Sequence, residues 1–293
     1  MRLIMFLWCM LYTVFLSAAS VGEQLQSASV TVATSSGSGS GAIVLRTPEG
    51  EPEIAFVLTA AHVVESCRQV RDIVTVDGTS KKAITYEDVA VRQDKIEDGR
   101  TVGELRLQCR VLNVDNRRDV ALLMVRAKGL FSTGVSFYLD APIPAVGTSV
   151  YHCGSPAGQM NAASLTGGII AQVGRRIPDF VGDENGYYDQ IDAATRPGSS
   201  GGIIALQADG RYIGMLTVGL TGSDSFGYMT PIRLIRDWAR EVKAEWVLDS
   251  KQKAPAREQI LKMPIESTPP ELAPRAAKPL VAPGATHDMP YWR

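Results

Sequence analysis

The sequence predicts an all-β protein made of two packed barrels or one large sandwich. Short apolar runs rich in Val and Ile recur from residue 27 to 231, and Gly, Pro, Asn and Asp break them. They number eleven, too many for one small sandwich. They lie at 29–34, 41–46, 54–64, 72–78, 105–114, 120–127, 149–154, 167–174, 188–194, 201–207 and 212–220. The polar, charged stretch 77–104 is expected to form a long surface hairpin or another surface excursion.

A helix is predicted to begin at residue 231, after the last strand. Thr230 is suited to cap it, and Pro231 suits the first helical position. Apolar residues then recur at helical spacing and form one stripe, at Ile235, Trp238, Ala239, Val242 and Trp246. We expect this stripe to pack on the barrel core.

The two ends of the chain differ from the part between them. Residues 1–20 combine a basic start, a long apolar run and small residues, which predicts a signal peptide or, if it stays uncleaved, a membrane anchor. Half of the sixteen prolines lie in residues 249–293, which few apolar residues accompany. This composition predicts a disordered, proline-rich tail.

Charge and cysteine content exclude several functions. With 30 basic and 31 acidic residues the net charge is −1, so we expect no nucleic acid partner, and a membrane partner only if the N-terminal segment remains attached. No CxxC or HExxH motif occurs, so neither a metal site nor a cofactor is predicted. Three cysteines remain after residue 20, an odd number that leaves at least one free thiol.

The segment TRPGSSGGII at 195–204 places Ser199 and Ser200 on a glycine-rich turn. Glycines allow backbone conformations in which successive N–H groups converge on one point and can bind an anion. A serine at the end of such a turn has donors for an oxyanion beside it. Ser200, directly before Gly201 and Gly202, occupies that place; alternatively the segment is an ordinary surface loop.

A nucleophilic serine needs a base and an acid that orients the base. His62 ends the apolar run FVLTAAHVV, which brings an imidazole to the edge of the core; a lone histidine there is more often structural. Asp119 precedes the apolar run 120–127 and is the preferred acid. Asp115, in a polar turn expected to be solvated, and Asp192 are the competitors.

The segments VLTAAHVV, DVALLMV and IDAATRPGSSGGII resemble the three catalytic blocks of trypsin-like serine proteases, and most closely those of the bacterial HtrA (Deg) type. The resemblance covers residues 27–247. It implies the chymotrypsin-like fold: two six-stranded antiparallel β-barrels with a seam near 130–145, followed by a C-terminal α-helix. It also implies an exported serine endopeptidase, periplasmic or secreted, that cleaves protein or peptide substrates through an acyl-enzyme.

The resemblance assigns roles to individual residues. Ser200 is the nucleophile, His62 the base and Asp119 the acid that orients it, while the N–H groups of Gly198, Ser199 and Ser200 form the oxyanion hole. Ala194 and Thr195 line the specificity pocket, and Leu216, Thr217 and Val218 pair with the substrate backbone. Because no acidic residue stands at Ala194, a small or medium apolar P1 residue is expected.

Other implications of the resemblance are less specific. The regions around Cys67 and Cys109 are neighbours in the family, which is compatible with a disulfide between them. No segment here resembles the PDZ domain that usually follows the protease, and a homo-oligomer remains open. Two alternatives also remain: a catalytically silent pseudoprotease that binds peptides, and a narrowly specific protease that processes its own chain.

Overall fold

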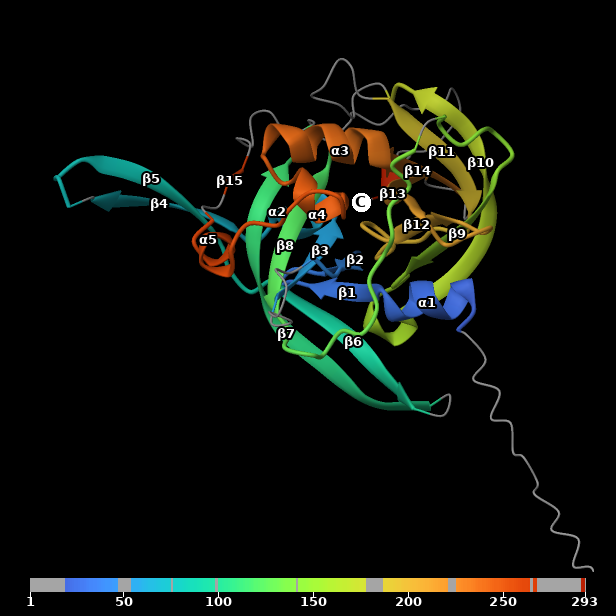
Figure 1. Cartoon of the computed structure of the whole chain (residues 1–293), viewed down its shortest axis with the longest axis horizontal. Coiled ribbons are helices and arrows are strands. Elements are labelled where there is room, and N and C mark those ends of the chain that lie inside the picture. Colours follow the sequence, from blue (N-terminus) through green and yellow to red (C-terminus); the bar gives the residue numbers. More distant parts are fainter. Residues whose placement is uncertain are drawn as a thin grey trace, which may run out of the picture.

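The computed structural model describes residues 19–46, 54–74, 76–97, 100–140, 142–177, 187–220, 225–263, 266–267 and 291–292. Two closed, six-stranded antiparallel β-barrels lie side by side, with helix α3 (Ile232–Glu241) across one end of the seam (Figure 1). The predicted all-β fold with two barrels and a C-terminal helix is therefore confirmed. The predicted signal peptide falls almost wholly on residues 1–18, outside the described part.

The first barrel closes because β7 pairs with both β6 and β8, in the order β7-β6-β1-β2-β3-β8. Its strands are β1 (Ser29–Ala33), β2 (Ser38–Val44), β3 (Ile54–Thr59), β6 (Ala90–Glu97), β7 (Arg100–Asp115) and β8 (Val120–Arg126). Every residue of β3 is buried, since its neighbours β2 and β8 cover both edges and the core covers both faces.

The second barrel closes in the same way, in the order β12-β9-β10-β11-β14-β13, with β12 pairing back to β13. Its strands are β9 (Ser149–Gly154), β10 (Ser164–Arg175), β11 (Tyr188–Ala193), β12 (Ile203–Leu206), β13 (Tyr212–Leu220) and β14 (Phe226–Pro231). A short two-residue strand, β16 (Tyr291–Trp292), adds to the open part of β13.

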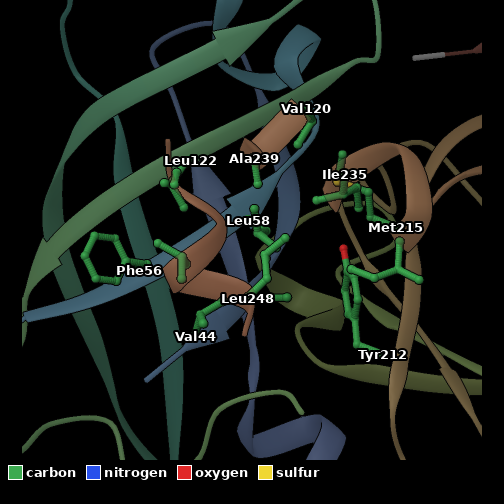
Figure 2. Packing of buried hydrophobic residues seen from close by; sticks show 14 of the residues in the cluster. Val44, Phe56, Leu58, Val120, Leu122, Tyr212, Met215, Ile235, Ala239 and Leu248 are labelled. Atoms are coloured by element: carbon green, nitrogen blue, oxygen red, sulfur yellow. The ribbon is translucent and has the colours of Figure 1, made fainter. Parts of the chain in front are cut away.

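One apolar cluster joins the two barrels. Phe56, Leu58 and Leu122 of the first barrel meet Tyr212 and Met215 of the second within it, and helix α3 covers them (Figure 2). Burying a side chain of this size contributes about 1.5–3 kcal/mol. The cluster therefore fixes how the barrels sit against each other, and the site between them depends on it.

The polar stretch 77–104 contributes to two surface hairpins. Strands β4 (Arg68–Val74) and β5 (Ser80–Tyr86) pair only with each other and form an arm that projects from the first barrel, while the far ends of β6 and β7 form a second (Figure 1). Both hairpins are largely exposed, which is why their sequences are polar.

The C-terminal helix is shorter than the apolar stripe predicts. Pro231 is the residue before α3, and Thr230 does not cap it, because its hydroxyl is bonded to Thr217 and to the Arg118 carbonyl. After Glu241 the chain turns, and Trp246 belongs to a separate short helix, α4 (Glu245–Leu248). Trp246 still packs on the core, edge-on to Phe56.

Order continues past residue 249, where the sequence predicts a disordered tail. Helix α5 (Arg257–Leu261) buries Ile260, and β15 (Glu266–Ser267) pairs with β7. Two arginines of the first barrel hold this segment by its carbonyl groups. Arg46 donates to Trp246, Asp249 and Gln252, and Arg110 donates to Leu261 and Met263. The predicted tail otherwise lies outside the described residues, apart from β15 and β16.

The connection between the barrels runs from β8 to β9, across the predicted seam at 130–145. Val135 N–H donates to the Ile43 carbonyl of the first barrel, and Tyr138 N–H donates to the Tyr212 carbonyl of the second. Among the described residues, none of the helices has the length and apolar character needed to span a bilayer.

Candidate active site

The register of the first barrel brings His62 and Asp119 together. Strand β3 pairs with β8, with Thr59 opposite Ala121. Asp119 precedes β8, and His62 lies in the one-and-a-half-turn helix α2 (Ala61–Glu65) that follows β3. Residues just beyond the ends of two paired antiparallel strands are neighbours, so a separation of 57 residues in sequence closes to a direct contact.

The carboxylate of Asp119 holds His62 by three contacts, one to its backbone and two to its ring. The backbone N–H of His62 donates to Oδ1 at 2.9 Å, and the ring Nδ1 lies 3.0 Å from Oδ1 and 2.8 Å from Oδ2. A carboxylate only accepts hydrogen bonds, so Nδ1 carries the proton and Nε2 is left as the basic nitrogen. The side chain of Asp119 is 5% exposed, which strengthens this contact relative to one in water.

The backbone of Asp119 is in the left-handed region, with φ of 54°. This conformation is uncommon for residues other than glycine, although aspartate adopts it more readily than most. Strained backbone persists where surrounding contacts over-determine it, and such positions concentrate at functional sites.

Ser200 lies in a turn that is tied to both barrels. Ser40 N–H in β2 donates to the Ser200 carbonyl at 2.7 Å, across the seam. Within the second barrel, Gly201 N–H donates to the Leu216 carbonyl and Leu216 N–H donates to the Gly202 carbonyl. The turn is therefore fixed on both sides of the hydroxyl.

Close packing explains the glycine after Ser200. Gly201 has φ of +83°, and a Cβ there would lie 2.2 Å from the Ser40 carbonyl oxygen and 3.0 Å from Ala60 N. Ala60 is the residue before helix α2, which carries His62. The serine turn thus presses against the start of the histidine helix.

Two polar atoms at this junction are buried and have no hydrogen-bond partner in the part of the chain that the structure describes: His62 Nε2 and Ser200 Oγ. They are also not bonded to each other, so the histidine–aspartate half of the predicted triad is formed and the serine–histidine bond is not. Catalytic hydrogen bonds are often long in the absence of substrate and tighten when it binds. Both atoms remain available, one as an acceptor and one as a donor.

Two backbone donors are available beside Ser200, instead of the three predicted. Gly198 N–H and Ser200 N–H donate no hydrogen bond to any described residue, and Gly198 has φ of +93°. Ser199 N–H instead closes the turn by donating to the Arg196 carbonyl at 2.9 Å. The predicted role of Ser199 as an oxyanion donor is therefore not supported, because its N–H is already used.

The competing acids are placed elsewhere. Asp115 is 2% exposed instead of solvated, and it accepts hydrogen bonds from Arg118 and from the Arg117 N–H. It stabilises the turn that presents Asp119. Asp192 is half-buried in β11, where it pairs with Ile169 and Phe226. Neither residue contacts His62.

The predicted specificity residues lie on the second barrel, next to the serine turn. Ala194 is exposed, whereas Thr195, Leu216, Thr217 and Val218 are buried. The Thr217 hydroxyl is bonded to Thr230, so β13 offers its backbone instead of this side chain to a neighbour. Its edge near Ser200 is suited to pairing with an extended peptide.

His152 is a histidine to which the sequence pattern assigns no function. It is 1% exposed, and its Nδ1 lies 3.1 Å from the Ala194 carbonyl. A Cβ on Gly202 would lie 2.9 Å from Nε2, so the ring packs directly under the serine turn. Burial lowers the pKa of His152 to about 4. The ring is therefore neutral at neutral pH.

Ser40 is the residue that sequence analysis overlooked. Its hydroxyl donates to the Gly198 carbonyl at 2.7 Å and accepts from the Ser155 N–H at 2.8 Å, and its carbonyl accepts from the Thr59 hydroxyl. The one available signal is its place in the segment GSGSG, where small residues allow close approach of two backbones.

The cysteines of the first barrel are not paired. Cys67 and Cys109 are both free thiols, although both border the same apolar cluster. The Cys109 thiol donates instead to the Leu107 carbonyl, and burial raises its pKa to about 12. The disulfide that the resemblance allows is therefore absent. Cys153 is a buried thiol, as predicted.

In the described ranges no cluster of His, Cys, Asp and Glu is able to hold a metal ion.

The sequence was compared with protein families and with known proteins. The family model described as "Trypsin-like peptidase domain" matches residues 26–215. The chain is 28% identical over 199 residues to "Serine protease HtrA-like" of Staphylococcus haemolyticus, covering 64% of this chain and 26% of that protein. It is 34% identical over 148 residues to "Serine protease Do-like HtrA" of Lactobacillus helveticus, covering 50% and 32%.

A solved structure gives the same fold. Deg5 superposes with a TM-score of 0.51 at 20% identity, covering 74% of this chain and 89% of that one. The chain spans about a quarter to two fifths of the length of the curated relatives it matches.

Proposed function

Because the chain belongs to the family of trypsin-like peptidase domains, we propose that it is a serine endopeptidase of the HtrA type. The observation that carries the proposal is the junction of the two barrels, where His62 is held by Asp119 and its free Nε2 is buried beside the turn of Ser200. Neither His62 Nε2 nor Ser200 Oγ is hydrogen-bonded to another described group.

The proposed mechanism assigns one role to each group. His62 Nε2 takes the proton of Ser200 Oγ as the oxygen attacks the scissile carbonyl, and later gives it to the leaving amine. Asp119 keeps the proton on Nδ1 and stabilises the imidazolium. The N–H groups of Gly198 and Ser200 bind the oxyanion, and one such donor contributes about 2.7–4 kcal/mol to the transition state.

Substrate binding is proposed to use the second barrel. An extended peptide would pair with β13 at Leu216–Val218, with its P1 side chain against Ala194 and Thr195. Ala194 brings no charge to this pocket, so we expect a small or medium apolar P1 residue.

We further propose that the protein is exported, since residues 1–20 have signal-peptide character and DegP-like relatives are named as periplasmic.

The test is reaction with a fluorophosphonate probe, compared between the wild-type protein and Ser200→Ala. Labelling that Ser200→Ala loses, while its circular dichroism is unchanged, supports the proposal. A folded wild-type protein that does not react would favour the silent pseudoprotease instead. A peptide-library profile with the same control then measures the P1 preference.

A further inference from the structure

The edge of β13 next to the serine turn is occupied by another segment of the same chain. Strand β16 pairs antiparallel with β13, with Gly219 opposite Trp292 and Leu220 opposite Tyr291. These residues follow Met263 by 28 and 29 positions, so the partner of β13 comes from the far end of the sequence.

Strand β16 lies on the same edge of β13 as Ser200. A strand has two edges, and β14 occupies one of them, with Leu216 opposite Met229 and Gly219 opposite Gly227. The other edge of Leu216 exchanges hydrogen bonds with Gly201 and Gly202. Because Gly219 is already paired with β14, Trp292 must lie on this second edge.

Only Thr217 and Val218 separate the two partners of this edge. With a rise of about 3.3 Å per residue, Gly219 is roughly 10 Å along the strand from Leu216. The antiparallel register makes the chain run from Leu220 towards Ser200 as it goes from Tyr291 to Trp292. A substrate that pairs antiparallel with Leu216–Val218, as proposed above, would follow the same path to Ser200.

We propose that the segment containing Tyr291 and Trp292 occupies the substrate-binding edge of β13, so that it competes with substrate within the same chain. The inference rests on the proposed function, since it names an intramolecular ligand of that site. Attachment to the same chain gives a segment an effective concentration on the order of millimolar. Even a short strand of low affinity is then an effective competitor.

The inference is tested with three forms of the full chain: wild type, Trp292→Pro and Trp292→Ala. Proline lacks the N–H of a strand residue and is excluded from paired positions, whereas alanine keeps the backbone donor. For Trp292→Pro we expect KM for a peptide substrate to fall at least about threefold with kcat unchanged, because only the competitor is lost. Trp292→Ala should stay closer to wild type.

A second measurement adds the segment from outside. A synthetic peptide of residues 284–293 should inhibit a protein that lacks 288–293 competitively, and a peptide of the same composition in scrambled order should inhibit it less. Mass analysis of wild type and Ser200→Ala should give an intact C-terminus in both. Fragments in the wild type alone would show that the segment is a substrate and overturn the inference.

The two proposals fail differently. Equal KM values for wild type and Trp292→Pro, in proteins that react with the fluorophosphonate, would reject the competing segment and leave the protease intact. A loss of activity in the folded Trp292→Pro protein would also reject it, because the segment would then support catalysis. If none of the three forms reacts with the probe, the proposed protease function itself fails.

Discussion

The N–H of Ser40 donates a hydrogen bond to the carbonyl of Ser200 at 2.7 Å, so the turn of the proposed nucleophile in the second barrel is fastened to a strand of the first. The Ser40 hydroxyl extends the connection to the Gly198 carbonyl. The position of the serine relative to His62 therefore depends on one residue of β2 as well as on the packing between the barrels.

The Ser40→Ala variant keeps the N–H bond and removes both hydroxyl bonds. We expect a loss of about 1–3 kcal/mol in the free energy of unfolding, because the Ser155 N–H loses its acceptor in a buried place. We also expect kcat to fall more than KM rises, since the Gly198 peptide loses its anchor. Urea unfolding and peptide hydrolysis measure the two effects.

The matched control is Ser38→Ala, because Ser38 is exposed on the same strand. The same fall in kcat in this variant would refute the role of the Ser40 hydroxyl in anchoring the serine turn.

Gly201→Ala is expected to abolish activity. The added Cβ would lie 2.2 Å from the Ser40 carbonyl oxygen, so the turn has to move away from β2. Gly78→Ala is the control, because Gly78 has nearly the same φ, +81°, with no atom within 4 Å of the added Cβ. It should cost only the conformational penalty, about 1–2 kcal/mol. Labelling by the fluorophosphonate and thermal unfolding compare the two; equal behaviour would show that the contact with Ser40 does not matter.

Asp119→Asn is expected to lower kcat on the order of 10⁴-fold while the fold is kept. An amide in place of the carboxylate allows the imidazole to adopt the tautomer with its proton on Nε2, which is unable to accept the serine proton. Hydrolysis of the best library peptide measures the loss. Asp192→Asn, the competing acid, should change kcat by less than about tenfold, and the opposite ranking would move the role to Asp192.

His152 is expected to make the protein sensitive to acid. Burial lowers its pKa from 6.5 to about 4, so below pH 6.5 the unfolded chain binds a proton that the folded protein does not. Stability should therefore fall as the pH drops from 6.5 to 4, by about 3 kcal/mol from this residue alone. It should change no further from this cause below pH 4.

The measurement is the free energy of unfolding in urea at several pH values for wild type and His152→Asn. The variant should show a smaller loss of stability between pH 6.5 and 4 by about that amount. Parallel curves for the two proteins would mean that the ring is already protonated or solvated in the folded state.

The sequence predicts the barrels well because their strands are short, apolar and separated by turn residues. It also predicts His62, Asp119 and Ser200 as the triad, since each is attached to a local pattern: the end of a buried strand, the start of another, and a glycine-rich turn. Their contact is not local. It follows from the register that places Thr59 opposite Ala121, and from the bond between Ser40 and Ser200.

Three predictions differ from the structure because a side chain or an N–H group has a specific partner that the residue pattern does not indicate. The stripe at 235–246 predicts one helix, but Trp246 reaches Phe56 only after a turn. Asp115 is predicted to be solvated because it lies in a polar turn, but it is buried and paired with Arg118. Ser199 is predicted to be a third oxyanion donor, but its N–H donates to the Arg196 carbonyl instead. Arg118 and Arg196 lie only three residues from Asp115 and Ser199, but the residue pattern alone does not show that these bonds form.

The hydrogen bonds of Arg46 and Arg110 to residues 246–263 have a consequence for how the chain folds. Residues 246–263 are synthesised long after the first barrel on which they pack, so their bonds to Arg46 and Arg110 form only when most of the chain has been made. Contacts this remote in sequence slow folding.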